Sequence, residues 1–206
     1  MLVAAANVQF SPSTFAPLAV GFFGLGTGYL IYFWQELAGW PPREEKVDLA
    51  SGVWGIWMPG FMQLLAGTYL FVGLAWFGSF REKPLYMAAL AFTAYGVHWF
   101  AIGYNRARGG DARVSTGMAL AFGMISVLGI VVFFRASDWP VGLLFIGLTL
   151  IYTSDFFASA RGLLPARMSA LGERSLGFWH LLTGLWLMYL TWATALNFAS
   201  GMHLPL

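Results

Sequence analysis

The sequence predicts an all-α integral membrane protein with six transmembrane helices per protomer. Composition is the first observation: of 206 residues, 59% are hydrophobic and only 10% are charged, whereas a soluble domain carries about 25% charged residues. Mean hydropathy is +0.69, too apolar for a chain of this length to hide its surface in one core. The second observation is a series of apolar stretches of about 20 residues, the length that crosses a bilayer core of about 30 Å.

The apolar stretches are separated by short polar loops. Helices are expected in them because a backbone in lipid must satisfy its own hydrogen bonds. All eleven Lys and Arg residues fall outside these stretches. Residues 1–206 are therefore predicted to form a single transmembrane domain without a separate soluble domain. The predicted spans are approximately 15–38, 53–78, 85–104, 116–134, 139–158 and 175–199.

Several functional classes find no support in the sequence. The absence of cysteine excludes disulfides, thiolate catalysis and Cys-based metal sites. The glycine-rich stretch 21–28 lacks the preceding strand and the acidic residue of a dinucleotide-binding loop. Small residues in a membrane helix instead predict close approach of neighbouring helices. We expect no enzyme activity, no cofactor, no metal and no nucleic-acid partner.

Basic residues are concentrated on the loops after the first, third and fifth spans. The positive-inside rule then places both termini outside the cytoplasm, in a multi-pass protein of the plasma (inner) membrane. The opposite face carries only Arg81, Lys83 and Arg135. The basic residues of the loops after the first, third and fifth spans are Arg43, Lys46, Arg106, Arg108, Arg113, Arg161, Arg167 and Arg174.

Two histidines, His98 and His180, lie inside predicted spans. Counting from the span ends places both in the third of the bilayer nearest the basic loops, with Glu36 and Asp155 towards the same side. Paired imidazoles can ligate haem, form a pH-sensitive vestibule, or hydrogen-bond between packed helices. These three interpretations remain open, and the two carboxylates are expected to snorkel to water.

The second span carries a proline, Pro59, followed one turn later by Gln63. A proline inside a helix frees a carbonyl and bends the axis. Lipid tolerates this where neighbouring groups or a cavity satisfy the backbone. An amide at this depth is expected to find a partner across helices or to line a pore.

Several segments together resemble the acetate uptake transporters, also called succinate–acetate permeases. Residues 16–20, APLAV, resemble the family's N-P-A-P-L-G-L signature. Residues 55–67, GIWMPGFMQLLAG, resemble its G-I-x-x-G-G-x-x-Q-x-x-A-G run, and residues 91–99, AFTAYGVHW, are similar to A-F-x-S-Y-G-x-F-W. The order and spacing of these motifs extend the resemblance over nearly the whole chain.

The resemblance implies six-helix protomers that assemble as hexamers, each with a narrow central pore. It places the narrowest ring at Phe23, Tyr95 and Leu148, where apolar side chains would exclude water and larger solutes and the Tyr hydroxyl would donate to a carboxylate. The implied function is a channel or secondary transporter for acetate or a similar small monocarboxylate. The family also keeps its termini in the cytoplasm, contrary to the loop charges. The same motifs place Pro17, Leu18, Gln63, Trp99 and Asn197 along the substrate pathway.

The chain departs from the family where two glutamates are replaced by Leu70 and Thr194. Three alternatives therefore stay open. A urea or short-amide channel has a similar length and number of spans. A membrane subunit of a larger complex could hold haem through His98 and His180. A purely structural membrane scaffold is the third.

Overall fold

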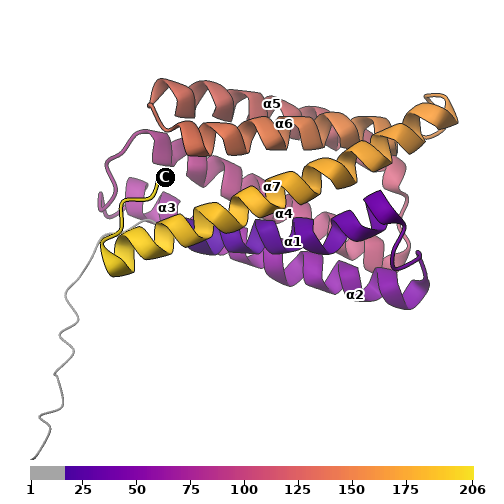
Figure 1. Ribbon diagram of the computed structural model, residues 1–206, viewed down its shortest axis with the longest axis horizontal. Coiled ribbons are helices and arrows are strands. Elements are labelled where there is room, and N and C mark those ends of the chain that lie inside the picture. Colours follow the sequence, from indigo (N-terminus) through magenta and orange to yellow (C-terminus); the bar gives the residue numbers. More distant parts are fainter. Residues whose placement is uncertain (1–16) are drawn as a thin grey trace, which may run out of the picture.

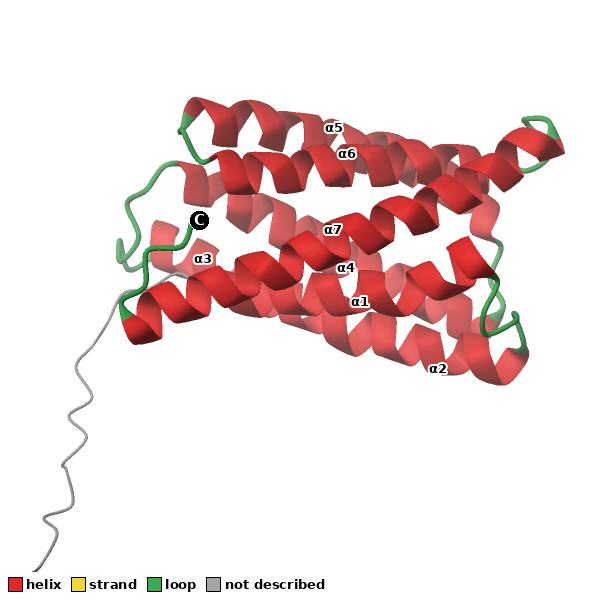
Figure 2. Ribbon diagram, viewed as in Figure 1, coloured by secondary structure: helices red, strands yellow, loops and turns green. Residues whose placement is uncertain are grey.

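A computed structural model describes residues 17–206, and these residues form a bundle of long antiparallel helices without strands (Figures 1 and 2). The second long helix is continuous from residue 45 to residue 75 but contains a π-helical turn in its middle. The elements are α1 (Leu18–Ala38), α2 (Glu45–Gly55), the π-helical turn η1 (Ile56–Phe61), α3 (Met62–Ala75), α4 (Pro84–Arg108), the 3-10 turn η2 (Ala112–Val114), α5 (Ser115–Arg135), α6 (Trp139–Ser159) and α7 (Ala166–Ser200).

The prediction of an all-α membrane protein with six membrane helices is confirmed. Within the described chain, five helices are long and apolar enough to cross a membrane, and α1 falls outside that group. α1 contains polar residues, including Gln35 and Glu36, and both are buried among its neighbours. The helices at 45–75 and 166–200 begin before the apolar stretches that predict them, because their first turns are polar. Residues 15 and 16 of the first predicted span lie outside the described residues.

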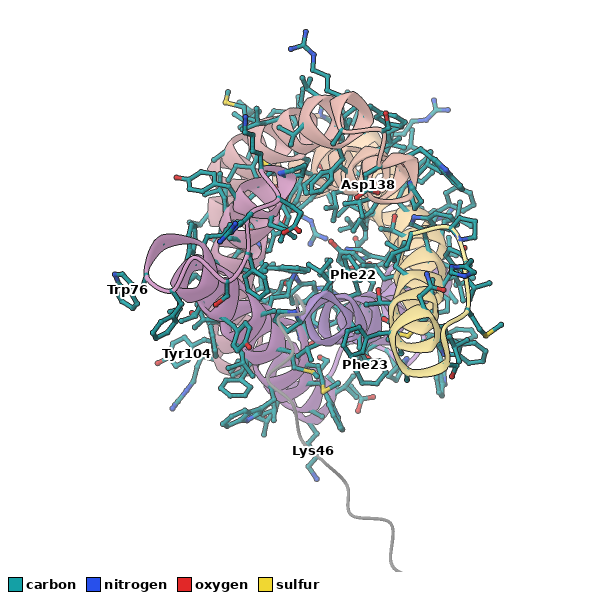
Figure 3. All side chains as sticks on the ribbon, turned by 90° about the vertical axis from the view of Figure 1, so that its left-hand side faces the viewer. Phe22, Phe23, Lys46, Trp76, Tyr104 and Asp138 are labelled. Carbon is teal, nitrogen blue, oxygen red and sulfur yellow. The ribbon has the colours of Figure 1, made fainter. Side chains whose placement is uncertain are left out.

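The long helices close into a ring. α1 packs against α7 on one side and against the helix 45–75 on the other, α6 packs between α5 and α7, and α4 joins the helix 45–75 to α5. Figure 3 looks along the bundle and shows this ring around its centre. The loops 39–44, 109–114 and 160–165 lie at one end, here called the basic end. The loops 76–83 and 136–138 and the C-terminal segment lie at the opposite end.

The glycine-rich stretch of α1 packs against the π-helical turn. A Cβ on Gly28 would lie 2.6 Å from Cγ of Pro59, and one on Gly24 would lie 2.7 Å from the carbonyl oxygen of Met58. Proline lacks an N–H group, and the wider π-helical turn accommodates it. The prediction that these glycines serve close helix packing is confirmed.

A second close approach joins α2 to α4. A Cβ on Gly52 would lie 2.5 Å from the carbonyl oxygen of Gly103, and a Cβ on Gly103 would lie 2.5 Å from that of Gly52. The two backbones therefore touch with no room for a side chain, as small residues permit in membrane helices. This contact fixes the distance between the two helices that form one wall of the ring.

Candidate solute pathway

Two cavities enter the ring from its two ends. The basic-end cavity has a volume of about 220 Å³ and reaches from Arg43 and Gly109 inwards to Tyr29, His98 and Tyr152. The opposite-end cavity has a volume of about 510 Å³ and reaches from the loop residues Glu82 and Asp138 inwards to Tyr95 and Leu148. Both lie between α1, α4 and α6, so they approach each other along the axis of the ring.

The cavities end on either side of one layer of buried side chains. Helices α1, α4 and α6 contribute residues to both cavities. On each of these helices, the innermost residue of the opposite-end cavity is followed within about one turn by a residue of the basic-end cavity. The pairs are Leu25 and Tyr29 on α1, Tyr95 and His98 on α4, and Leu148 and Ile151 on α6. Tyr95 is 2% exposed and Leu148 is 1% exposed. Two of the three side chains that the motifs place in the ring, Tyr95 and Leu148, therefore lie buried at the inner end of the opposite-end cavity.

Phe23, the third side chain that the motifs place in the ring, lines neither of the two cavities. Phe23 is 42% exposed, whereas Phe22 is 2% exposed and lines the opposite-end cavity. Figure 3 shows Phe22 pointing towards the middle of the ring and Phe23 away from it. Consecutive helical residues differ by about 100° in direction, so a motif with two adjacent phenylalanines does not indicate which one faces inwards.

The hydroxyl of Tyr95 is bonded within the protein. It lies 2.9 Å from Oγ of Ser126 on α5, and the Ser126 hydroxyl donates to the carbonyl oxygen of Phe122 at 2.8 Å. A serine hydroxyl has one hydrogen, so Tyr95 is the donor to Ser126. The Tyr95 oxygen keeps its acceptor capacity, which differs from the predicted donation to a carboxylate.

Gln63 is fully buried in the wall of the opposite-end cavity. Neither Oε1 nor Nε2 has a hydrogen-bond partner among the described residues. Buried amides normally find partners, so this side chain offers both a donor and an acceptor to a solute. Leu18, also predicted on the pathway, lines the same cavity.

The two histidines line the basic-end cavity together with Trp99. His180 Nδ1 lies 2.5 Å from Glu36 Oε2, and its ring stacks on Tyr29 with 4.5 Å between centroids. His98 Nδ1 lies 3.3 Å from the hydroxyl of Tyr152. Two distant parts of the sequence thus supply imidazoles to one cavity. In the described part of the chain, no group of three or more His, Cys, Asp or Glu residues is placed to hold a metal ion.

The carboxylates Glu36 and Asp155 both face the basic-end cavity. Glu36 is 8% exposed and bonded to His180, so the expectation that it snorkels to water is wrong. The carboxyl group of the half-buried Asp155 has no hydrogen-bond or ion-pair partner within residues 17–206, and its backbone carbonyl accepts from Ser159 at 2.7 Å. Sequence reasoning missed this pairing because 144 residues separate Glu36 from His180.

The arginines at the mouth of the basic-end cavity are already paired. Arg43 and Arg161 both bind Glu173, with N–O distances of 3.0 and 2.9 Å. Arg106 binds Asp48 at 3.1 Å. The positive charge that the loop sequences predict at this end is therefore largely neutralised where it meets the cavity.

The mouth of the opposite-end cavity is acidic, with Glu82 and Asp138 in its wall. Asp138 caps α6 by accepting from the backbone N–H of Val141 at 3.1 Å. Partial burial raises the pKa of the Asp138 carboxyl, and the hydrogen bond from Val141 opposes that shift. Neither side chain offers positive charge to a solute.

Pro17 and Asn197, also predicted on the pathway, line neither cavity. Pro17 precedes α1, and its carbonyl accepts from the N–H of Val20 at 3.2 Å. Asn197 donates to the carbonyl of Leu204 and accepts from its N–H, both at 2.8 Å. Both residues lie at the same end of the bundle, where their hydrogen bonds hold the chain.

Comparison with known proteins identifies the fold. No protein-family model matches the chain, and no curated protein matches it. Among solved structures, that of the bacterial acetate channel SatP matches with a TM-score of 0.72 at 16% sequence identity, over 95% of this chain and 98% of that chain. The chain has the fold of that acetate channel, as the motif resemblance implies.

Proposed function

We propose that the protein is a membrane channel for acetate or a similar small monocarboxylic solute, as a divergent member of the acetate uptake transporter family. One observation carries this proposal. Two cavities from opposite ends of the ring stop on either side of a buried layer that contains Leu25, Tyr95 and Leu148, and Phe22 lies one turn from Leu25 in the wall of the opposite-end cavity. The shared fold with an acetate channel supports it.

The layer has the chemistry of a size filter. Phe22 and Leu148 are apolar, and a narrow apolar ring resists entry of water and hydrated ions. Burying a polar group without a partner is costly, so a solute with few polar atoms crosses most easily. Tyr95 and Gln63 offer hydrogen bonds beside this ring, while a methyl group would pack against its apolar members.

We also propose that protomers assemble as hexamers in the plasma membrane, as the family resemblance implies. The outer surface supports a lipid or protomer environment because it exposes large apolar side chains such as Trp57, Met124 and Trp192, at 60%, 73% and 70% exposure. Each protomer would hold its own pathway, since both cavities lie inside one chain.

A channel for urea or short amides is the second candidate. The observation that favours it is the orientation of Tyr95, whose oxygen is an acceptor because its hydrogen is given to Ser126. Amides carry N–H donors that match such an acceptor, whereas an ionised carboxylate carries none.

The test is uptake of labelled acetate and labelled urea into proteoliposomes of the purified protein, with protein-free vesicles as the baseline. We expect saturable acetate uptake, and we expect Leu148→Ala to admit larger acids because it widens the layer. Uptake of urea alone would support the second candidate. Failure of both solutes to enter would refute a channel of this class.

A further inference from the structure

We infer that the pathway selects neutral solutes that donate hydrogen bonds, namely undissociated short carboxylic acids or short amides, over carboxylate anions. Tyr95 and Asp155 are the specificity-determining acceptors on the two sides of the layer. This inference rests on the proposed function, because it concerns which form of a small solute crosses the ring.

The hydrogen bond at Tyr95 has one possible direction. Ser126 gives its hydrogen to the carbonyl of Phe122, so Tyr95 gives its own to Ser126, at 2.9 Å. The Tyr95 oxygen can therefore only accept a hydrogen bond from a solute, through its lone pairs. A carboxylate oxygen meeting it would face another acceptor, whereas an O–H or N–H group would complete a hydrogen bond.

The carboxyl group of Asp155 lies in the wall of the basic-end cavity. The neighbouring Glu36 is bonded to His180, but Asp155 has no such partner among the residues that the structure describes. His98 lines the same cavity and is 7% exposed, and its Nε2 atom has no hydrogen-bond partner among the described residues. A solute with a donor can bind Asp155, while an anion would be repelled by it when ionised.

The walls of the two cavities, as far as the described residues form them, offer no free Lys or Arg side chain. Every Lys or Arg that lines a cavity in residues 17–206 is held by a carboxylate: Arg43 and Arg161 by Glu173, and Arg106 by Asp48. Anion pathways in membranes are commonly lined by Arg or Lys. Among the described residues, the charged side chains in the walls of the two cavities that form no ion pair are acidic.

The layer itself imposes a desolvation cost on any solute that crosses it. Phe22, Leu25 and Leu148 are each no more than 2% exposed and form its apolar part. An ion crossing apolar surroundings without a counter-charge pays far more than a neutral polar molecule. The layer therefore favours the same neutral class of solute as the two acceptors.

Two measurements on the full-length protein separate the neutral and anionic forms. Labelled acetamide uptake into proteoliposomes reports a neutral donor-bearing solute, and current in planar bilayers bathed in acetate reports the anion. For the wild type we expect acetamide uptake well above protein-free vesicles and no acetate current above the bare bilayer. The undissociated acid is followed by labelled acetate uptake at several imposed membrane potentials, and we expect that uptake to be independent of potential.

Two variants test the two acceptors. Asp155→Asn replaces a carboxyl by an amide of similar shape that can donate, and Ser126→Ala leaves the hydrogen of Tyr95 free to face the pathway. In each, we expect acetamide uptake to fall by about three- to tenfold, the effect of one hydrogen bond, and an acetate current to rise above that of the bare bilayer. Thr153→Val is the matched control on α6, since Thr153 is exposed and lines neither cavity.

The outcomes distinguish this inference from the proposed function. An acetate current that follows the membrane potential in the wild type, with acetamide excluded, would overturn the inference and leave an acetate channel standing. Unchanged acetamide uptake and no acetate current in both variants would overturn the roles of Tyr95 and Asp155. Absence of both acetate and acetamide flux would overturn the proposed function and the inference together.

Discussion

Glu36 Oε2 lies 2.5 Å from His180 Nδ1, and this contact ties α1 to α7 inside the basic-end cavity. Both side chains are less than a tenth exposed. A buried pair of this kind is sensitive to loss of one member, because the remaining polar group is then left without a partner.

We expect Glu36→Leu and His180→Leu, each alone, to destabilise the protein by about 3–5 kcal/mol, and the double variant to be less destabilised than the sum of the two. Thermal unfolding of the purified protein in detergent measures the four members of this double-mutant cycle. Strictly additive losses would show that the two side chains do not act as a pair.

Exchanging the two adjacent phenylalanines for alanine tests which one belongs to the narrow layer. We expect Phe22→Ala to raise uptake of a four-carbon acid relative to acetate by about tenfold or more, since pocket size discriminates added methylenes by such factors. Phe23→Ala should leave that ratio unchanged because Phe23 faces outwards. Labelled uptake into proteoliposomes gives both ratios, and the reverse result would restore Phe23 as the pore residue.

Helix packing between α2 and α4 is tested at Gly103. We expect Gly103→Leu to prevent normal folding or to destabilise the protein by more than about 3 kcal/mol, because its Cβ would lie 2.5 Å from the Gly52 carbonyl oxygen. Gly117→Leu on α5 is the control, since nothing lies within 4 Å of a Cβ there. Size-exclusion profiles and unfolding temperatures in detergent compare the two, and equal behaviour would refute the close contact.

The C-terminal segment is held by Asn197 through two hydrogen bonds to Leu204. We expect Asn197→Ala to speed amide hydrogen exchange in residues 201–206 while acetate uptake stays unchanged, because Asn197 lines neither cavity. Loss of uptake with unaltered exchange would instead return Asn197 to the pathway.

Much of the fold can be predicted from the sequence because lipid imposes simple rules. Uninterrupted apolar stretches predict the helices, and the glycines at 21–28 predict close packing, which Gly28 shows against Pro59. Helix starts are less predictable, since polar first turns such as Glu45–Asp48 carry no hydropathy signal although they continue the helix.

The site is less predictable because it depends on directions and on distant partners. The motif places an aromatic residue at the layer, but one helical step of about 100° decides between Phe22 and Phe23. The hydroxyl of Tyr95 is a donor or an acceptor to the solute according to Ser126, which lies on another helix. The burial of Glu36 likewise depends on His180.

The two cavities also determine where a transmembrane voltage acts. Water filling both cavities would carry the potential of each compartment deep into the ring, so that nearly the whole voltage would fall across the short layer at Tyr95 and Leu148. An elementary charge crossing that layer would exchange about 2.3 kcal/mol per 100 mV with the field. A neutral solute crosses the same distance without electrical work, so its net flux is driven by its concentration gradient alone.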